Sequence, residues 1–212
     1  LYHLWINPKG GDIVRIELLN HDKSKDSDQP FVMLESDAKR TYVAQSGLIG
    51  LNGPDSKPDR PNYAFEKTAY TIADAKAAKD KDGKTSQVLA VPMVFKTADG
   101  VEIIKTFTVK KGEYPIDVSY QVVNRSAQNW QGQMFGQIKR DNSDDPGKTS
   151  QGIFTLGTYL GGAWGTPDDR AMEQFEVIDI SPEDELREKW NGFIHSHHYD
   201  IASNYFDSSL AL

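Results

Sequence analysis

The chain has 212 residues, no cysteine and a formal net charge of −7, from 24 Lys and Arg against 31 Asp and Glu. A chain of this length can bury one substantial core, the lack of cysteine excludes disulfide and thiol chemistry, and the acidic balance argues against a nucleic-acid-binding surface, which needs cations facing the phosphates. No apolar run approaches the roughly 18 residues of a membrane-spanning helix, and the start at Leu1, without an initiator methionine or signal peptide, leads us to expect a fragment of a longer protein.

The first third of the chain alternates apolar and polar residues in short runs, which indicates half-buried strands. Residues 7–11 separate the first two runs, and their glycines are expected to supply positive φ in a turn. A phosphate-binding loop would need a following helix, and none is apparent. The expected strands cover residues 1–6, 13–19, 31–35, 40–45, 63–65 and 70–72.

Two stretches in this part lack a strand pattern. Residues 46–61 carry three glycines and three prolines, which is typical of a surface Ω-type loop and less often of a functional lid. Residues 73–84 are rich in Lys, Asp and Ala and are expected to form either a frayed helical turn or a solvated loop. Residues 87–95 form the next expected strand, in which Pro92 predicts an edge position or a bulge because it cannot donate to the ladder.

The most complete alternation lies in residues 101–124, which predict a β-hairpin. Its Gly112–Glu113 pair suits a type II′ turn in which Lys111 pairs with Tyr114. This register places apolar residues opposite each other on one face, and a slip of one residue would turn one strand inside out. The facing pairs are Val109 and Ile116, Phe107 and Val118, and Ile103 and Val122.

Lys105 interrupts the apolar face of this hairpin, opposite Tyr120. We expect its stem to pack in the core while its ammonium group reaches a sheet edge, as long cationic side chains commonly do.

The remainder of the chain continues the all-β pattern with more glycine. Strands are expected at residues 130–138 and 175–180, and residues 140–152 form a polar loop. Thr166-Pro167-Asp168 and Ser181-Pro182 are expected to begin two short helices, with Thr or Ser as N-cap and Pro at N1. Roughly ten short strands with regular turn signals predict one sandwich domain without internal repeats.

Candidates for chemistry are weak throughout. His195, His197 and His198 could chelate a metal, but without cysteine or an HExxH spacing the interpretation as exposed histidines is preferred. Neither Asp22/Asp26/Asp28 nor Asp144/Asp145 fits a calcium loop. No nucleophile elbow, phosphate loop or dinucleotide fingerprint is present. Glycosidase-type carboxylate pairs stay open because their spacing is spatial. We therefore predict no metal, no cofactor and no enzymatic site.

Short motifs nevertheless occur in a specific order between residues 4 and 180. The central one is Gly100 to Asn124, with Lys105-Thr106-Phe107, Gly112-Glu113-Tyr114 and Val122-Val123-Asn124. The others are Asn7…Gly10-Gly11-Asp12, Phe31…Leu34-Glu35, Ala44-Gln45-Ser46-Gly47-Leu48, Gly53-Pro54-Asp55, Val91-Pro92-Met93, Phe135-Gly136-Gln137, Gly161-Gly162-Ala163-Trp164 and Thr166-Pro167-Asp168. Taken together, the chain resembles the large periplasmic domain of YidC-type membrane protein insertases.

The resemblance implies a β-supersandwich related to galactose-mutarotase-like domains, covering residues 1–212 as a single domain. It implies a location on the periplasmic side of the bacterial inner membrane, with anchoring transmembrane helices outside this chain. It implies Sec translocon accessory subunits and inserting membrane proteins as partners, a scaffolding and chaperone role, and a weak groove ligand. The insertase activity itself would belong to the membrane region.

Two features depart from the family pattern. The family expects a Gly-Gly-Trp stretch past Glu188, which residues 190–199 match only loosely. The chain also ends at Leu212, before further strands would be expected. Residues 188–212 are thus either divergent or the end of a truncated fragment, and both interpretations leave open strand edges.

Two functions are weighed for this fold. The first is a non-catalytic interaction module, with a partner surface at Tyr159, Leu160, Trp164 and Pro167, because aromatics on irregular, glycine-rich backbone are typical of recognition surfaces. The alternative is a carbohydrate-binding or aldose-epimerase-like sandwich, which fold alone cannot separate from the first. Epimerases need an acid and a base within hydrogen-bond reach. None of the five histidines lies in such a context, so the binding module is preferred.

Overall fold

The computed structural model describes residues 1–79, 83–141, 143, 161–166, 169–176 and 206–210. Two units are distinguished, residues 1–146 with 199–212, and residues 147–198. The described residues contain no helix that is long and apolar enough to cross a membrane.

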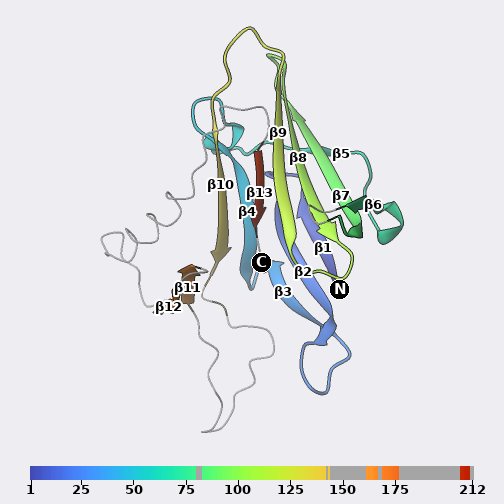
Figure 1. Cartoon of the computed structure of the whole chain (residues 1–212). Coiled ribbons are helices and arrows are strands. Elements are labelled where there is room, and N and C mark those ends of the chain that lie inside the picture. The colour runs from blue at the N-terminus through green and yellow to red at the C-terminus, as the bar shows by residue number, and fades with distance from the viewer. Residues whose placement is uncertain (80–82, 142, 144–160, 167–168, 177–205, 211–212) are drawn as a thin grey trace. The chain divides into compact units, whose positions relative to one another are not determined.

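The first unit contains two antiparallel sheets (Figure 1). The first sheet has the order β1-β2-β3-β4-β10, with β1 Tyr2–Asn7, β2 Asp12–Asp22, β3 Pro30–Ser36, β4 Thr41–Ile49 and β10 Gln133–Arg140. The second has the order β13-β9-β8-β7-β5, with β6 also paired to β7; its strands are β5 Ala64–Phe65, β6 Lys76–Lys79, β7 Thr85–Lys96, β8 Val101–Lys110, β9 Ile116–Asn124 and β13 Phe206–Leu210.

The core of this unit lies between the inner faces of the two sheets, as in a sandwich. Fully buried side chains come from both sheets, namely Ile16, Leu34 and Leu48 from the first and Met93, Ile103, Phe107 and Val118 from the second. The expected all-β sandwich is confirmed. The helical elements among the described residues are two 3₁₀ turns, η1 Pro54–Ser56 and η2 Ile72–Asp74.

The central hairpin has the register that the alternation predicts. Val109 pairs with Ile116, Phe107 with Val118, and Lys105 with Tyr120. The turn, however, was misplaced by one residue. Glu113 N–H donates to the Lys110 carbonyl at 3.2 Å and Gly112 has φ 82°, so Lys111 and Gly112 form the centre of the turn. The expected pairing of Lys111 with Tyr114 is absent from the ladder; Pro115 has no N–H to donate, and pairing resumes at Ile116.

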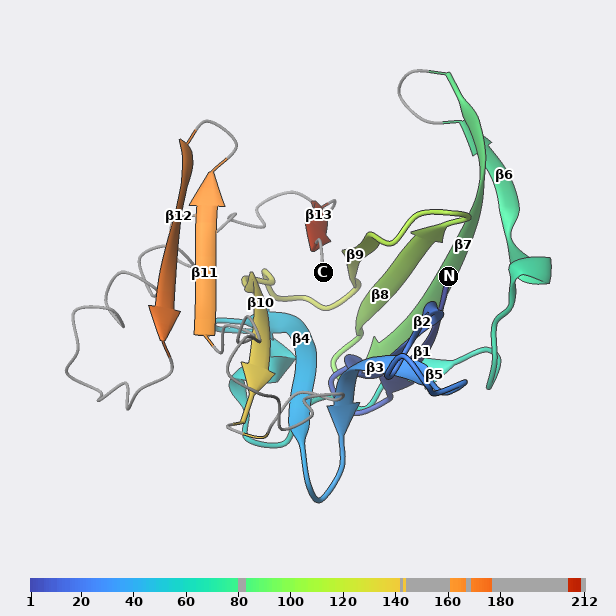
Figure 2. The same ribbon diagram turned by 90° about the horizontal axis from the view of Figure 1, so that it is seen from below.

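Pro92 occupies the edge position that its ring requires. Lys111 N–H donates to the Gln87 carbonyl at 2.9 Å, so odd-numbered residues of β7 bond toward β8 and Pro92 faces the other way. On that outer side β6 pairs with residues 85–88 and β5 with residues 93–94. The stretch from Leu89 to Pro92 lies between these two pairings. Figure 2 shows β6 beside the N-terminal end of β7.

Several expected boundaries were wrong. Residues 70–72 do not form a strand: the Thr71 hydroxyl accepts from Ala73 N–H and Asp74 accepts from Thr71 N–H, a capping box that begins η2. Strand β6 follows in a stretch expected to be a loop or a frayed helical turn. Strand β4 continues to Ile49, three residues past the expected start of the loop.

The second unit contains the hairpin of β11 Gly161–Thr166 and β12 Asp169–Glu176. Thr166 pairs with Asp169, so the helix expected from Thr166 is wrong. Threonine, proline and aspartate serve in turns as well as at helix starts, and here strand pairing prevails. The helix expected at Ser181, and residues 177–180 of the last expected strand, lie outside the described residues.

Candidate functional site

The partner residues expected from the sequence fall mostly outside the described part of the chain. Tyr159, Leu160 and Pro167 lie outside it, as do His195, His197 and His198. Trp164 lies in β11, where its backbone pairs with Glu173. Among the described residues no group of three or more potential ligand side chains is arranged to hold a metal ion.

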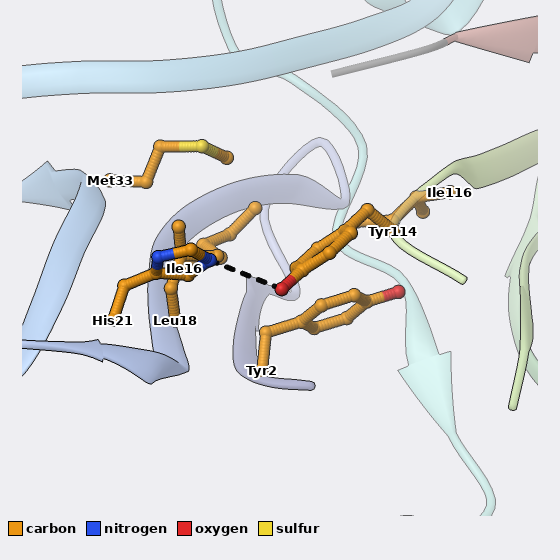
Figure 3. Close-up of a pocket in the computed structure, with 7 residues that line it drawn as sticks. All are labelled: Tyr2, Ile16, Leu18, His21, Met33, Tyr114 and Ile116. Carbon is orange, nitrogen blue, oxygen red and sulfur yellow. Dashed lines mark hydrogen bonds between the residues drawn. The ribbon is translucent and has the colours of Figure 1, made fainter. Parts of the chain in front are cut away.

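A groove in the first unit has a volume of about 270 Å³. Figure 3 shows its lining from three strands of the first sheet and from the end of the central hairpin: Tyr2, Ile16, Leu18, His21, Met33, Tyr114 and Ile116. Period-two alternation explains the set on β2, since Ile16 and Leu18 point to the same face. No sequence pattern indicates this groove, because its residues come from distant segments of the chain.

Polar groups in the groove are few. The His21 Nε2 and the Tyr114 hydroxyl lie 3.2 Å apart, and the Tyr2 and Tyr114 rings lie side by side with centroids 6.4 Å apart (Figure 3). Burial raises the pKa of Tyr2 to about 12. No carboxylate is among the lining residues, so the groove does not supply His21 with the acidic partner that acid–base chemistry on a sugar requires. It suits an apolar ligand.

The second candidate is a cluster of charged groups in the interior, here called the inner cluster: Asp12, Asp55, Arg60 and Lys105. Arg60 lies in the loop after η1 and donates to both carboxylates, from Nη1 to Asp12 at 2.6 Å and from Nε to Asp55 at 2.8 Å. The second oxygen of Asp55 accepts from Leu48 N–H at 2.8 Å. Arg60 thus pairs with both carboxylates, and Asp55 also binds the backbone at Leu48.

Lys105 completes this cluster from the centre of β8. It is fully buried, and its Nζ donates to the carbonyls of Gly10, Gly11 and Ser46 at 3.1, 2.7 and 3.0 Å. Desolvation lowers its pKa to about 7, opposed by the negative charge of Asp12. The expectation that its ammonium reaches a sheet edge was wrong. Two carbonyls of the β1–β2 turn and one of β4 satisfy it inside the sandwich.

The backbone of the β1–β2 turn makes room for this arrangement. Gly11 has φ 63°, and a Cβ there would lie 2.7 Å from Met93 Sδ and 3.0 Å from Lys105 Cδ. Only glycine combines that conformation with so close an approach. The break at Lys105 in an apolar pattern was the one sequence signal for the cluster; nothing in the sequence linked Arg60 or Asp55 to it.

On the outer face of the first sheet lies a second charged set, here called the outer ladder: His3, Arg15, Glu17 and Glu35. Arg15 bonds to Glu17 at 2.8 Å and to Glu35 at 2.5 Å, and His3 lies 3.7 Å from Glu17. The Arg15 guanidinium also lies 5.7 Å from the ring centroid of Trp5, which is 42% exposed. The ladder is partly buried: Arg15 is half-buried, and the side chains of Glu17 and Glu35 are less exposed than that of Arg15.

Comparison with known proteins identifies the family. The family model described as the YidC periplasmic domain matches residues 1–200. Among curated relatives, membrane protein insertase YidC of Marinomonas sp. is 47% identical over 74% of this chain, that of Stutzerimonas stutzeri 42% over 89%, and that of Alcanivorax borkumensis 40% over 84%. The matched regions are 27%, 31% and 29% of those relatives' lengths. The chain belongs to the family of YidC periplasmic domains, which lie on the periplasmic side of the inner membrane.

Proposed function

We propose that this chain is a non-catalytic interaction and scaffolding domain of a membrane protein insertase, and that it contacts accessory subunits of the Sec translocon while membrane proteins are inserted. The relatives bear the name membrane protein insertase, and the chain spans about three-tenths of their length. Insertion itself is therefore proposed for the whole protein, and this domain is assigned the binding of partners.

The non-catalytic part of the proposal rests on one observation: the charged groups of the inner cluster bind one another and the backbone. A catalytic carboxylate or amine must be free to reach substrate, but Asp12, Asp55 and Lys105 are buried and bonded to structural partners. In the groove, which does open to solvent, the described residues give His21 a hydrogen-bonding contact with Tyr114 and no carboxylate partner. Perturbed ionisable groups in this domain thus support the fold.

The partner surface is proposed at Tyr159, Leu160, Trp164 and Pro167, on the sequence argument that aromatic anchors on glycine-rich backbone suit recognition. The test is the double variant Tyr159→Ser/Trp164→Ser in the full-length insertase. We expect Sec components to stop co-purifying while the melting temperature stays unchanged. Trp5→Ser is the matched control, because Trp5 is an exposed aromatic elsewhere on the domain. Unaltered co-purification, or a large fall in melting temperature, would return these residues to a packing role.

The groove is proposed to take a weak apolar ligand, such as a side chain of an inserting protein. Its lining is mainly aliphatic and aromatic, and Tyr114 at its mouth is 40% exposed. Titration of an apolar extended peptide into isotope-labelled protein should shift the amide signals of Leu18, Met33 and Tyr114. A Met33→Lys variant should lose those shifts; shifts elsewhere on the domain would remove the groove as the site.

The competing assignment as a sugar epimerase is tested directly. Incubation of the chain with free aldoses, followed by polarimetry, should show only the background rate of mutarotation, because no acid and base converge in the groove. Enzyme-level turnover that disappears on His21→Gln would overturn the non-catalytic assignment.

A further inference from the structure

The donors of Lys105 match the acceptors around it in number. An ammonium group has three N–H donors, and three carbonyl oxygens surround Nζ, so the charged form satisfies every acceptor. Two of those oxygens have a second donor: Arg60 Nη2 reaches the Ser46 carbonyl at 2.9 Å and the Gly10 carbonyl at 3.3 Å. Among the side-chain donors described, Gly11 receives a bond only from Lys105.

The charges that face Lys105 offset only part of the cost of burying its ammonium group. Both carboxylates of the cluster, Asp12 and Asp55, are bonded to Arg60 rather than to Lys105. The guanidinium of Arg60 itself repels the ammonium, and the phenols of Tyr63 and Tyr120 are uncharged because burial raises their pKa. Removing the Lys105 charge from water therefore meets only partial compensation.

A neutral amine at this position would have two N–H donors and a lone pair. It could keep the short bond to Gly11 and one other bond, and would have to release either Gly10 or Ser46. Arg60 already donates to both of these carbonyls, so neither would be left without a donor. The cluster thus accommodates two protonation states of the same lysine.

We propose that Lys105 is a proton-controlled tie between the two sheets of this domain. Charged, it holds the Gly10–Gly11 turn and Ser46 of the first sheet together against β8 of the second. Neutral, it releases one carbonyl to Arg60, and the turn loosens while the domain stays folded. This inference is independent of the proposed Sec contact, since it rests on bonds within the domain.

The direction of the pH effect follows from burial. Between a folded pKa of about 7 and the ordinary lysine value of 10.5, the unfolded chain binds a proton that the folded domain has released. Global stability therefore rises with pH across that window, and the unfolding equilibrium constant falls by up to about tenfold per pH unit. Below pH 7 both states are protonated and this dependence disappears.

The test follows the Lys105 Cε and Hε signals by NMR from pH 6 to 11 in the whole chain. We expect Lys105 to titrate well below the ordinary lysine value of 10.5, and the amide signals of Gly10, Gly11 and Gly47 to shift with the same midpoint. A Lys105 midpoint at or above 10.5, or turn amides that do not follow it, would overturn the proposal.

Denaturation of variants gives a second readout. The urea midpoint of the wild type should rise between pH 7 and 9.5, and Lys105→Met should remove that rise. Lys111→Met, an exposed lysine in the turn of the same hairpin, should keep it. A Lys105→Met protein with wild-type pH dependence would contradict the tie. If Lys105→Met fails to fold, the NMR titration of the wild type decides alone.

Discussion

The inner cluster and the outer ladder contain the same kinds of charged side chains in opposite surroundings. In the inner cluster the Asp55 carboxylate is wholly buried and the Asp12 carboxylate nearly so, and each is fixed by Arg60. In the outer ladder Arg15 bridges Glu17 and Glu35 beside an exposed tryptophan, and the Arg15 side chain is 35% exposed. Both networks have short bonds, so bond length does not distinguish them.

The difference lies in what replaces a lost partner. Water can reach the half-buried Arg15 when one of its partners in the outer ladder is removed, so we expect the loss of that partner to cost less than in the inner cluster. In the inner cluster the remaining charge stays buried without compensation, and removal is costly even if the intact pair adds little net stability. Sequence position alone does not reveal this contrast; Asp12 and Arg15 lie three residues apart on β2.

The largest effect is expected where the two faces of one strand are compared. Phe107 is 2% exposed and faces Val118 in the core, so Phe107→Ala should reduce the free energy of unfolding by roughly 3–5 kcal/mol. Thr106→Ala and Ser119→Ala, which pair on the opposite face, should each cost far less. Urea midpoints with the reverse order would show that the register is wrong.

A smaller but sizeable effect is expected from one carboxylate of the inner cluster. Asp55→Asn keeps the shape but sets an amide N–H₂ against either Arg60 Nε or Leu48 N–H, so we expect a loss of about 2–3 kcal/mol. Asp59→Asn is the matched control four residues away, because Asp59 forms an exposed pair with Lys9. It should not change the urea midpoint measurably. Equal effects of the two variants would abolish the contrast between buried and exposed pairs.

The smallest effect is expected in the outer ladder. Glu35→Gln removes one partner of Arg15, while Glu17 remains, and it also removes the carboxylate that lies 4.0 Å from Arg40. The loss should be about 1 kcal/mol, below that expected for Asp55→Asn. Salt should shrink this difference further, since exposed pairs are screened. Urea denaturation at low and high salt measures both. A loss as large as that of Asp55→Asn would mean that the ladder is not solvated as its position indicates.

Local patterns determined much of this fold in advance. The alternation in residues 101–124 was sufficient for the register of the central hairpin, because strand faces and turn length constrain each other. The 3₁₀ turn at Ile72 was missed because residues 70–72 have the aromatic and β-branched side chains typical of a strand, whereas Thr71 and Asp74 form a capping box that begins the turn. The helix expected at Thr166 was wrong because residues that favour helix starts also occur at the ends of paired strands, and Thr166 pairs with Asp169.

The interior sites required contacts that sequence spacing does not encode. Arg60 meets Asp12 across 48 positions, and Lys105 meets Gly11 across 94. The break in the apolar face at Lys105 indicated that something polar must satisfy it, but neither its depth nor its partners. The groove has the same origin, since Tyr2 and Tyr114 come together only when the two sheets pack.

Pro92 has a consequence for how copies of this domain behave at high concentration. Between the two short covering strands, the backbone groups of the even-numbered residues Ala90 and Pro92 point outward, and an open strand edge of this kind is a template for pairing with another molecule. At Pro92 the backbone nitrogen is bonded to the ring Cδ and has no hydrogen, so it cannot donate the hydrogen bond that such pairing would need. We therefore expect this proline to limit edge-to-edge pairing between copies of the domain, while the ladder to β8 is kept.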